Sequence, residues 1–104
     1  MSYQIEYLPA ALHDLTDSAC YIGVELHNPD AADRLAEKIV TAVDSVSDMP
    51  YRFAAYHPAK PLHREYRRVV VDNYVVFYWA DEEKQKVTIV RVIYGGRRIE
   101  DMLE

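Results

Sequence analysis

Cysteine is almost absent from this sequence. The single cysteine, Cys20, has no partner for a disulfide within the chain, and no metal-ligand spacing surrounds it. An unpaired cysteine is typical of a protein that works in a reducing cytoplasm, which is the location we expect. Cys20 falls in a stretch with apolar periodicity, which predicts a buried core thiol rather than a reactive nucleophile.

Long hydrophobic runs are missing too. No apolar run approaches the roughly 18 residues that a membrane-spanning helix requires, and residues 1–4 do not begin a secretory signal. The sequence also lacks a phosphate-binding loop, a catalytic triad and a zinc knuckle. His13, His27 and His57 are scattered and form no ligand pair. We therefore expect no membrane, cofactor, metal or small-molecule substrate.

Positive charge is scarce in the first half of the chain. Residues 1–51 carry two cations, Arg34 and Lys38, against nine acids, a net of −7. Residues 52–100 carry ten cations against six acids, a net of +4, although the whole chain has a net charge of −5. This asymmetry indicates that an anionic partner would contact the C-terminal half. An unevenly charged, merely solvated surface is the plain alternative.

The first half of the chain predicts a strand and two helices in a single domain, residues 1–104. Tyr3, Ile5 and Tyr7 alternate with polar residues, which predicts a short strand. Asn28-Pro29 predicts the stop of one helix and the start of a second, which ends near Met49-Pro50. Two helices joined so closely are expected to form an antiparallel hairpin. Asp14 falls off the apolar stripe that predicts the first helix. The stripe consists of Leu8, Leu12, Leu15, Ala19, Ile22 and Leu26.

The second half predicts strands. After an irregular stretch over residues 51–65, the runs 67–71 and 74–79 flank Asp72-Asn73, which predicts a hairpin with a tight turn. Residues 86–93 predict another strand, which Gly95-Gly96 ends, and a short helix could begin near Arg98. The order predicts an α+β fold in which a helical hairpin packs on an antiparallel sheet.

Seven short pieces of the sequence, in this order, resemble the RelE/ParE superfamily, the toxins of type II toxin–antitoxin systems that include the plasmid stabilisation proteins. The resemblance covers nearly the whole chain. The pieces are Ala11-x-x-Asp14-Leu15, Tyr21-Ile22, Asn28-Pro29 with Ala31-Ala32 and Leu35, Met49-Pro50, Tyr66-Arg67-Arg68, residues 73–78, and residues 90–94 with Arg97.

The resemblance implies a growth-inhibiting toxin that a cognate antitoxin holds inactive by wrapping around it. The superfamily has two branches. RelE-like members enter the ribosomal decoding site and cut messenger RNA, whereas ParE-like members inhibit DNA gyrase and are not known to be nucleases. An interaction module that only binds its partner is the alternative from a different class.

Cleavage of RNA by its own 2′-hydroxyl needs a base, an acid and cations on the phosphate. The RNA-cutting branch commonly carries an arginine in the second hairpin strand, and this position falls at Val75. It also often carries a tyrosine in its last helix, which here is Leu103, while Arg97 does match a family arginine. The sequence therefore favours gyrase inhibition without enzymatic activity, and ribosome-dependent cleavage of messenger RNA is the alternative.

A replacement catalytic site has three candidates, His63, Tyr94 and Arg97. His63 is a residue type suited to proton transfer, and Tyr94 lies next to two arginines in sequence. The plain alternatives are a loop histidine, a packed tyrosine at a strand end and exposed surface cations, with Phe77, Tyr78 and Trp79 in the core. The residues expected to bind the target are Lys60, Arg64, Arg67, Arg68, Arg97 and Arg98.

Overall fold

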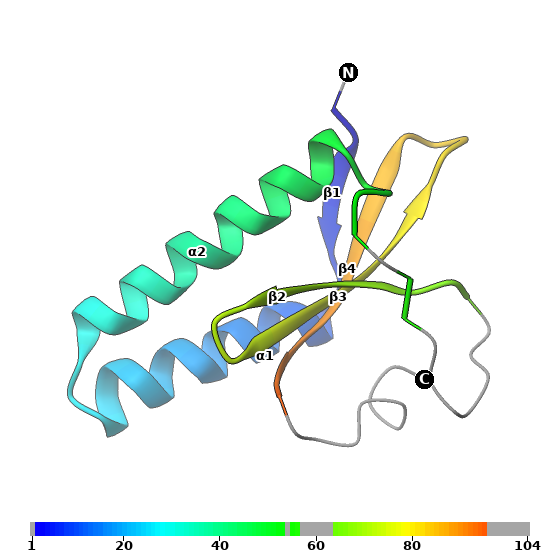
Figure 1. Cartoon of the computed structure of the whole chain (residues 1–104). Helices are drawn as coiled ribbons and strands as arrows, with labels where there is room; N and C mark the ends of the chain where they lie inside the picture. The colour runs from blue at the N-terminus through cyan, green and yellow to red at the C-terminus, as the bar shows by residue number, and fades with distance from the viewer. Residues whose placement is uncertain (1, 54, 57–63, 96–104) are drawn as a thin grey trace.

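The computed structural model describes residues 2–53, 55–56 and 64–95. A helical hairpin lies against a four-stranded sheet (Figure 1). This is the α+β fold that the sequence predicts. The terminal helix expected near Arg98 lies outside the described residues. The elements are β1 (Gln4–Tyr7), α1 (Pro9–Cys20), the π-helical turn η1 (Tyr21–Glu25), α2 (Pro29–Asp48), β2 (Arg67–Val71), β3 (Tyr74–Asp81) and β4 (Lys86–Tyr94).

The sheet has the strand order β1-β4-β3-β2. The strands β2, β3 and β4 are antiparallel, as expected, but β1 runs parallel to β4, with Gln4 beside Lys86 and Tyr7 beside Ile89. The sheet is therefore mixed and not wholly antiparallel. Strands joined by a tight turn must be antiparallel. No such turn joins β1 to β4, so the sequence pattern did not fix their relative direction.

The β2–β3 hairpin has the predicted turn. Asp72 has a φ of 53°, a left-handed conformation that aspartate tolerates better than most residues. The register then pairs Val71 with Tyr74 and Arg67 with Tyr78. Because β3 continues to Asp81, its last residues extend past the start of β2.

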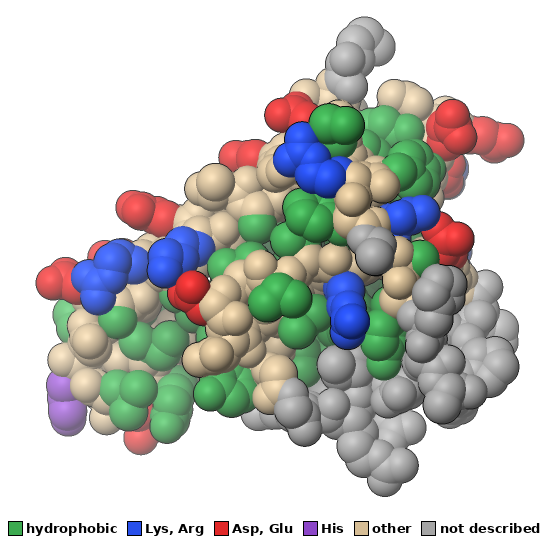
Figure 2. Space-filling model, viewed as in Figure 1, with side chains coloured by type: hydrophobic (Ala, Val, Ile, Leu, Met, Phe, Trp, Pro, Cys, Tyr) green, Lys and Arg blue, Asp and Glu red, His purple; other side chains and the backbone are tan. Residues whose placement is uncertain are grey.

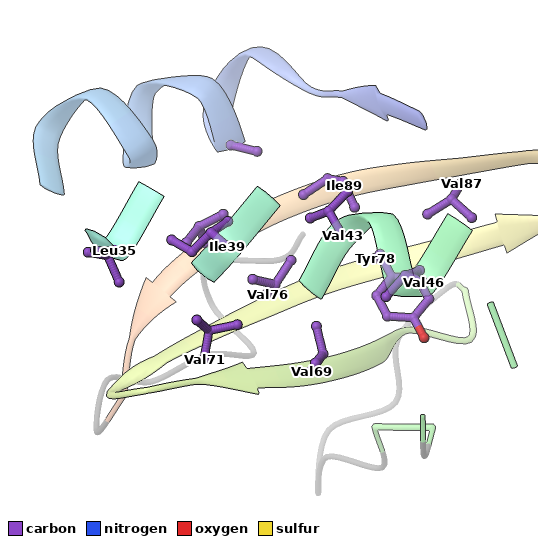
Figure 3. Close-up of a cluster of buried hydrophobic side chains, with 12 residues drawn as sticks. Leu35, Ile39, Val43, Val46, Val69, Val71, Val76, Tyr78, Val87 and Ile89 are labelled. Atoms are coloured by element: carbon purple, nitrogen blue, oxygen red, sulfur yellow. The ribbon is translucent and has the colours of Figure 1, made fainter. Parts of the chain in front are cut away.

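The main hydrophobic core lies between α2 and one face of the sheet (Figure 3). Leu35, Ile39, Val43 and Val46 follow one another at spacings of three and four, so they form one stripe along the helix. Burying each such side chain contributes about 1.5–3 kcal/mol before the entropy of ordering is subtracted. The stripe faces buried side chains of the sheet, namely Val69, Val71, Val76, Tyr78, Val87 and Ile89.

A second, smaller cluster lies on the other face of the sheet. It consists of the buried residues Tyr66, Phe77, Val90 and Ile93, with Trp79 packed against them. Neighbouring residues of a strand point to opposite faces, so Phe77 belongs to this cluster while Tyr78 belongs to the main core. Both faces of β3 and β4 are apolar, which explains their unbroken hydrophobic runs.

The first helix differs from its prediction. Ala11 is its only buried residue, and Leu12, Leu26 and Cys20 are exposed, so the prediction of a buried core thiol is wrong. After α1 the helix widens into the π-helical turn η1, where the N–H of Leu26 donates to the carbonyl oxygen of Tyr21 at 3.0 Å. A π-helical turn holds an extra residue, so the side chains around it leave the predicted stripe.

The second helix begins as predicted. The side-chain oxygen of Asn28 accepts a hydrogen bond from the N–H of Ala31 at 3.1 Å, and Pro29 occupies the first helical turn. This cap satisfies one of the N–H groups that a helix start leaves unpaired. Among the described residues, no helix is both long and apolar enough to cross a membrane.

Candidate functional site

The structure places the predicted site residues at two ends of the β2–β3 hairpin. Arg67 and Arg68 begin β2, where Arg67 pairs with Tyr78. Tyr94 ends β4 and pairs with Tyr74 beside the hairpin turn. Four residues of strand separate the two ends, which corresponds to about 13 Å. Tyr94 and the arginines of β2 therefore do not form one site. Lys60, His63, Arg97 and Arg98 lie outside the described residues.

Each arginine near the start of β2 lies over an aromatic ring. The Cζ of Arg64 is 4.2 Å from the ring centre of Trp79. The corresponding distances are 5.0 Å from Arg67 to Tyr51 and 5.3 Å from Arg68 to Tyr56. A guanidinium over an aromatic face is attracted by the negative potential of the ring. We call these three pairs the arginine–aromatic cluster. Figure 2 shows Lys and Arg side chains distributed over this view of the molecule, among hydrophobic ones.

Further ring contacts hold the aromatic side chains of the cluster in place. Tyr66 meets Trp79 edge to face at 5.8 Å, and Tyr56 meets Phe77 in the same manner at 5.2 Å. Tyr66 and Phe77 are both buried in the second cluster. The rings of Trp79 and Tyr56, which lie under Arg64 and Arg68, are therefore held against the sheet. This agrees with the core packing that the sequence predicts for Phe77 and Trp79.

Arg67 differs from its two neighbours because it is bonded on both sides. Its guanidinium donates to the carbonyl of Phe53 at 2.6 Å and to Glu65 at 2.7 Å, and its side chain is 18% exposed. Burial raises the pKa of Tyr78 to about 12, although the positive charge of Arg67 opposes this rise. Arg67 thus has a structural role at the start of the hairpin.

A pocket of about 350 Å³ lies beside Arg64. It forms where β3 extends past the start of β2, so that Trp79 and Ala80 form part of the lining. Tyr51, Glu65 and Arg67 also line it. The pocket thus combines aromatic surface with two guanidinium groups and one carboxylate.

A second pocket, of about 300 Å³, lies at the hairpin turn. Its ionisable groups among the described residues are Asp72 and Tyr94. The carboxylate of Asp72 is bound by Lys38 of α2 at 3.1 Å. Tyr94 is half exposed and meets Tyr74 edge to face at 5.3 Å, so it is less packed than a core tyrosine. The residues that line this second pocket are Val70, Asp72, Asn73, Val75, Tyr94 and Gly95.

The described part of this second pocket lacks one group that RNA cleavage requires, a cation to bind the phosphate. Val75 lines it at the position where the RNA-cutting branch carries an arginine, and no described lining residue is a cation. Without a cation, charge that develops on a phosphate is not stabilised. The described residues also contain no group of three or more metal-binding side chains.

Sequence analysis missed an ion pair between Asp14 and Arg91. Asp14 accepts two hydrogen bonds from the guanidinium at 2.7 and 2.8 Å, and a third from the N–H of Val92 at 3.0 Å. This hydrogen bonding raises the pKa of Arg91. Helical periodicity placed Asp14 off the apolar stripe and so on the solvent side. The available signal was its place in the Ala11-x-x-Asp14-Leu15 piece.

Comparisons with known proteins agree with this architecture. The solved structure of the RelBE2 toxin–antitoxin complex from Mycobacterium tuberculosis is similar, with a TM-score of 0.59, 24% identity, and 90% of this chain and 99% of that chain covered. The chromosomal ParDE system from P. aeruginosa is similar with a TM-score of 0.70, 16% identity, and coverages of 89% and 96%. No curated protein sequence matches.

These structural likenesses show the fold alone, because the sequence identities are low. The family assignment comes from the sequence itself. The family model described as the ParE toxin of the parDE type II toxin–antitoxin system matches residues 5–99, which is nearly the whole chain. The chain therefore belongs to the ParE toxin family of type II toxin–antitoxin systems.

Proposed function

We propose that this protein arrests bacterial growth by inhibiting DNA gyrase, without cutting RNA, and that a cognate antitoxin neutralises it. The observation that carries this choice is the pocket at the hairpin turn. Val75 lines it at the position where the RNA-cutting branch commonly carries an arginine. Losing a single catalytic group commonly lowers a rate by two to four orders of magnitude. A toxin of this family with such a pocket is better suited to binding an enzyme than to cleaving a messenger.

The exposed apolar side chains of the helical hairpin support a protein partner. Figure 2 shows hydrophobic side chains gathered at the far end of the hairpin, away from β1. Such side chains gain stability when a partner removes them from water. The solved RelBE2 and ParDE structures are toxin–antitoxin systems, which agrees with an antitoxin as that partner. The exposed hydrophobic residues of the hairpin are Leu12, Tyr21, Val24, Leu26 and Val40.

The experiment is to induce the protein in a bacterial host and follow two quantities within minutes. RNA 5′ ends are mapped across the transcriptome, and the supercoiling of a reporter plasmid is measured in the same cells. We expect loss of negative supercoiling and a DNA-damage response, with no codon-periodic RNA ends. Co-expression of the antitoxin should restore growth and supercoiling.

A double variant provides the control. Arg97→Ala with Arg98→Ala removes two cations that the sequence predicts to contact the target, and circular dichroism verifies that the variant folds. We expect cells that express this variant to grow normally and to keep normal plasmid supercoiling. Ribosome-dependent RNA cuts with normal supercoiling would assign the protein to the RNA-cutting mode. His63→Ala and Tyr94→Phe would then identify the group that replaced the missing ones.

A further inference from the structure

We propose that the arginine–aromatic cluster is a docking site for an acidic, extended peptide segment of a partner protein. In this arrangement Arg64 and Arg68 bind carboxylates of the peptide, which passes over the pocket beside Trp79. The inference concerns the surface and the chemistry of its partner. It does not depend on whether the protein inhibits gyrase.

The two arginines are ready to donate hydrogen bonds. Both are exposed, and within the described part of the chain their contacts are with the rings of Trp79 and Tyr56. A guanidinium that rests on a ring keeps its N–H groups available for a carboxylate. The ring also restricts the long side chain in advance, so less entropy is lost when a ligand binds.

The two arginines lie close enough for one short peptide. Arg68 pairs across the sheet with Phe77, and Arg64 lies over Trp79, two residues further along β3. Alternate residues of a strand point to the same face and are about 7 Å apart. This is also the spacing of alternate side chains in an extended peptide. A short extended peptide along this face therefore spans the region of both arginines, and several carboxylates on one side of it are presented to the two guanidinium groups.

Local charge favours a peptide over a nucleic acid. Arg67 is already paired with Glu65, whose carboxylate also lines the pocket beside Arg64. Within the described residues, the cluster offers two cations without a carboxylate partner, beside the carboxylate of Glu65, whereas a polyphosphate chain needs several phosphate contacts for affinity. By contrast, a planar guanidinium binds a single carboxylate through two parallel hydrogen bonds. Trp, Tyr and Arg, which form this surface, are also the residues that contribute most to binding at protein interfaces.

Trp79 makes the proposal directly testable, because it is the only tryptophan of the chain. The probe is an octapeptide of alternating Glu and Thr carrying a fluorescent label, titrated with purified protein and followed by anisotropy and by Trp79 emission. A Gln-Thr octapeptide serves as the uncharged control. We expect saturable binding of the Glu-Thr peptide with a change in Trp79 emission, weakening as salt is added, and no binding of the Gln-Thr peptide.

Variants then locate the site. Arg64→Ala with Arg68→Ala should weaken binding by at least about tenfold, because the hydrogen bonds between the guanidinium groups and the carboxylates are lost. Arg64→Lys keeps the charge but loses the planar group, so we expect an intermediate affinity. Arg52→Ala is the matched control, since Arg52 is exposed and bonds to Ser45 and Met49 outside the cluster. It should bind the peptide as the unmodified protein does.

Three results would overturn the proposal. One is the absence of peptide binding by the folded protein, and another is unchanged binding by the double alanine variant. The third uses a single-stranded RNA octamer as the ligand. If it binds more tightly than the Glu-Thr peptide and depends on the same two arginines, the cluster belongs to a nucleic acid partner.

Discussion

Asp14 shows how one side chain can close a sheet edge. The parallel pairing of β1 with β4 ends at Tyr7 and Ile89, so the N–H of Val92 has no strand partner on that side. Asp14 of α1 accepts this N–H and binds Arg91 from the neighbouring position. Unpaired strand edges invite pairing with other chains, and a helix laid along the edge prevents it. The ion pair thus fixes α1 against β4.

We expect Asp14→Asn to lower the free energy of unfolding by about 2–3 kcal/mol, because the partly buried ion pair and two charge-assisted hydrogen bonds between Asp14 and Arg91 would be lost. Urea denaturation measures the loss. Asp17→Asn is the matched control on the same helix, since the carboxylate of Asp17 is 67% exposed and pairs with exposed His13. A change within about 0.5 kcal/mol is expected there. Equal losses in the two variants would contradict a special role for Asp14.

Tyr78 makes stability depend on alkaline pH. Its hydroxyl donates to the carbonyl of Pro50 at 2.7 Å in the core, and burial raises its pKa from 10.0 to about 12. The folded state therefore holds the proton more tightly than the unfolded state does. The contribution of protonated Tyr78 to the free energy of unfolding is therefore fully present below pH 10 and is lost as the pH rises toward 12.

We expect Tyr78→Phe to lower the free energy of unfolding by about 1–3 kcal/mol at pH 7, because the buried carbonyl of Pro50 loses its donor. The difference between the two proteins should then narrow above pH 10, where the tyrosine protein alone loses this contribution. Denaturation curves at pH 7, 10 and 11 measure the difference. A difference that stays constant across this range would refute the assignment.

The elements differ in how well the sequence predicted them. The α2 stripe and the β2–β3 turn depend on local rules, periodicity and turn chemistry, and both were predicted correctly. The course of α1 depends on tertiary contacts: it lies along the β4 edge and continues into a π-helical turn, so its apolar periodicity overstated its burial. Cys20 at its end is exposed for this reason. The direction of β1 was not encoded locally either.

The site was predicted only in part. The cationic nature of the β2 start was visible in Tyr66-Arg67-Arg68, but the ring under each arginine was not, because Tyr51, Tyr56 and Trp79 come from three separate segments. Sequence proximity also suggested that Tyr94 acts with arginines. Those arginines, Arg97 and Arg98, lie outside the described residues, so this pairing stays a prediction, and the arginines of β2 lie at the other end of the hairpin from Tyr94.

Replacing each of two glycines, Gly23 and Gly95, by alanine should change the stability of the protein in opposite directions. In η1, a Cβ on Gly23 would lie 3.7 Å from the Cβ of Ala32, an ordinary contact, so Gly23→Ala should stabilise by about 0.5–1 kcal/mol through helix propensity. After β4, a Cβ on Gly95 would lie 3.3 Å from the carbonyl oxygen of Asn73, which also accepts the Gly95 N–H. Gly95→Ala should therefore lower the melting temperature. Thermal unfolding of both variants tests the pair, and shifts of the same sign would contradict it.

At the scale of the whole molecule, the two kinds of surface lie apart. Three exposed apolar side chains, Tyr21, Val24 and Leu26, lie at η1 and the tip of the helical hairpin, whereas the arginine–aromatic cluster lies at the start of β2. A domain of this size buries only about two-thirds of its unfolded surface, so its own core leaves a small margin of stability. A partner that covers the hairpin tip would therefore act on stability as well as on activity.

The antitoxin is expected to raise the stability of the folded chain substantially. A partner that binds only the folded chain, present at about 100 times its Kd, adds about 2.7 kcal/mol to the free energy of unfolding. For a domain of about 100 residues this raises the melting temperature by roughly 10–20 °C. Calorimetry of the purified protein, with and without antitoxin, measures the rise. Equal melting temperatures would show that the antitoxin does not bind the native chain.

Variants at opposite ends of the molecule locate the contact. Val24 is 64% exposed at the hairpin tip, so Val24→Glu should leave the melting temperature of the free chain nearly unchanged. It should reduce the rise caused by the antitoxin, because a charge buried in an apolar interface without a partner is unfavourable. Lys84→Glu, in the exposed β3–β4 turn far from the tip, is the control and should keep the full rise. If Val24→Glu also keeps the full rise, the antitoxin does not cover the hairpin tip.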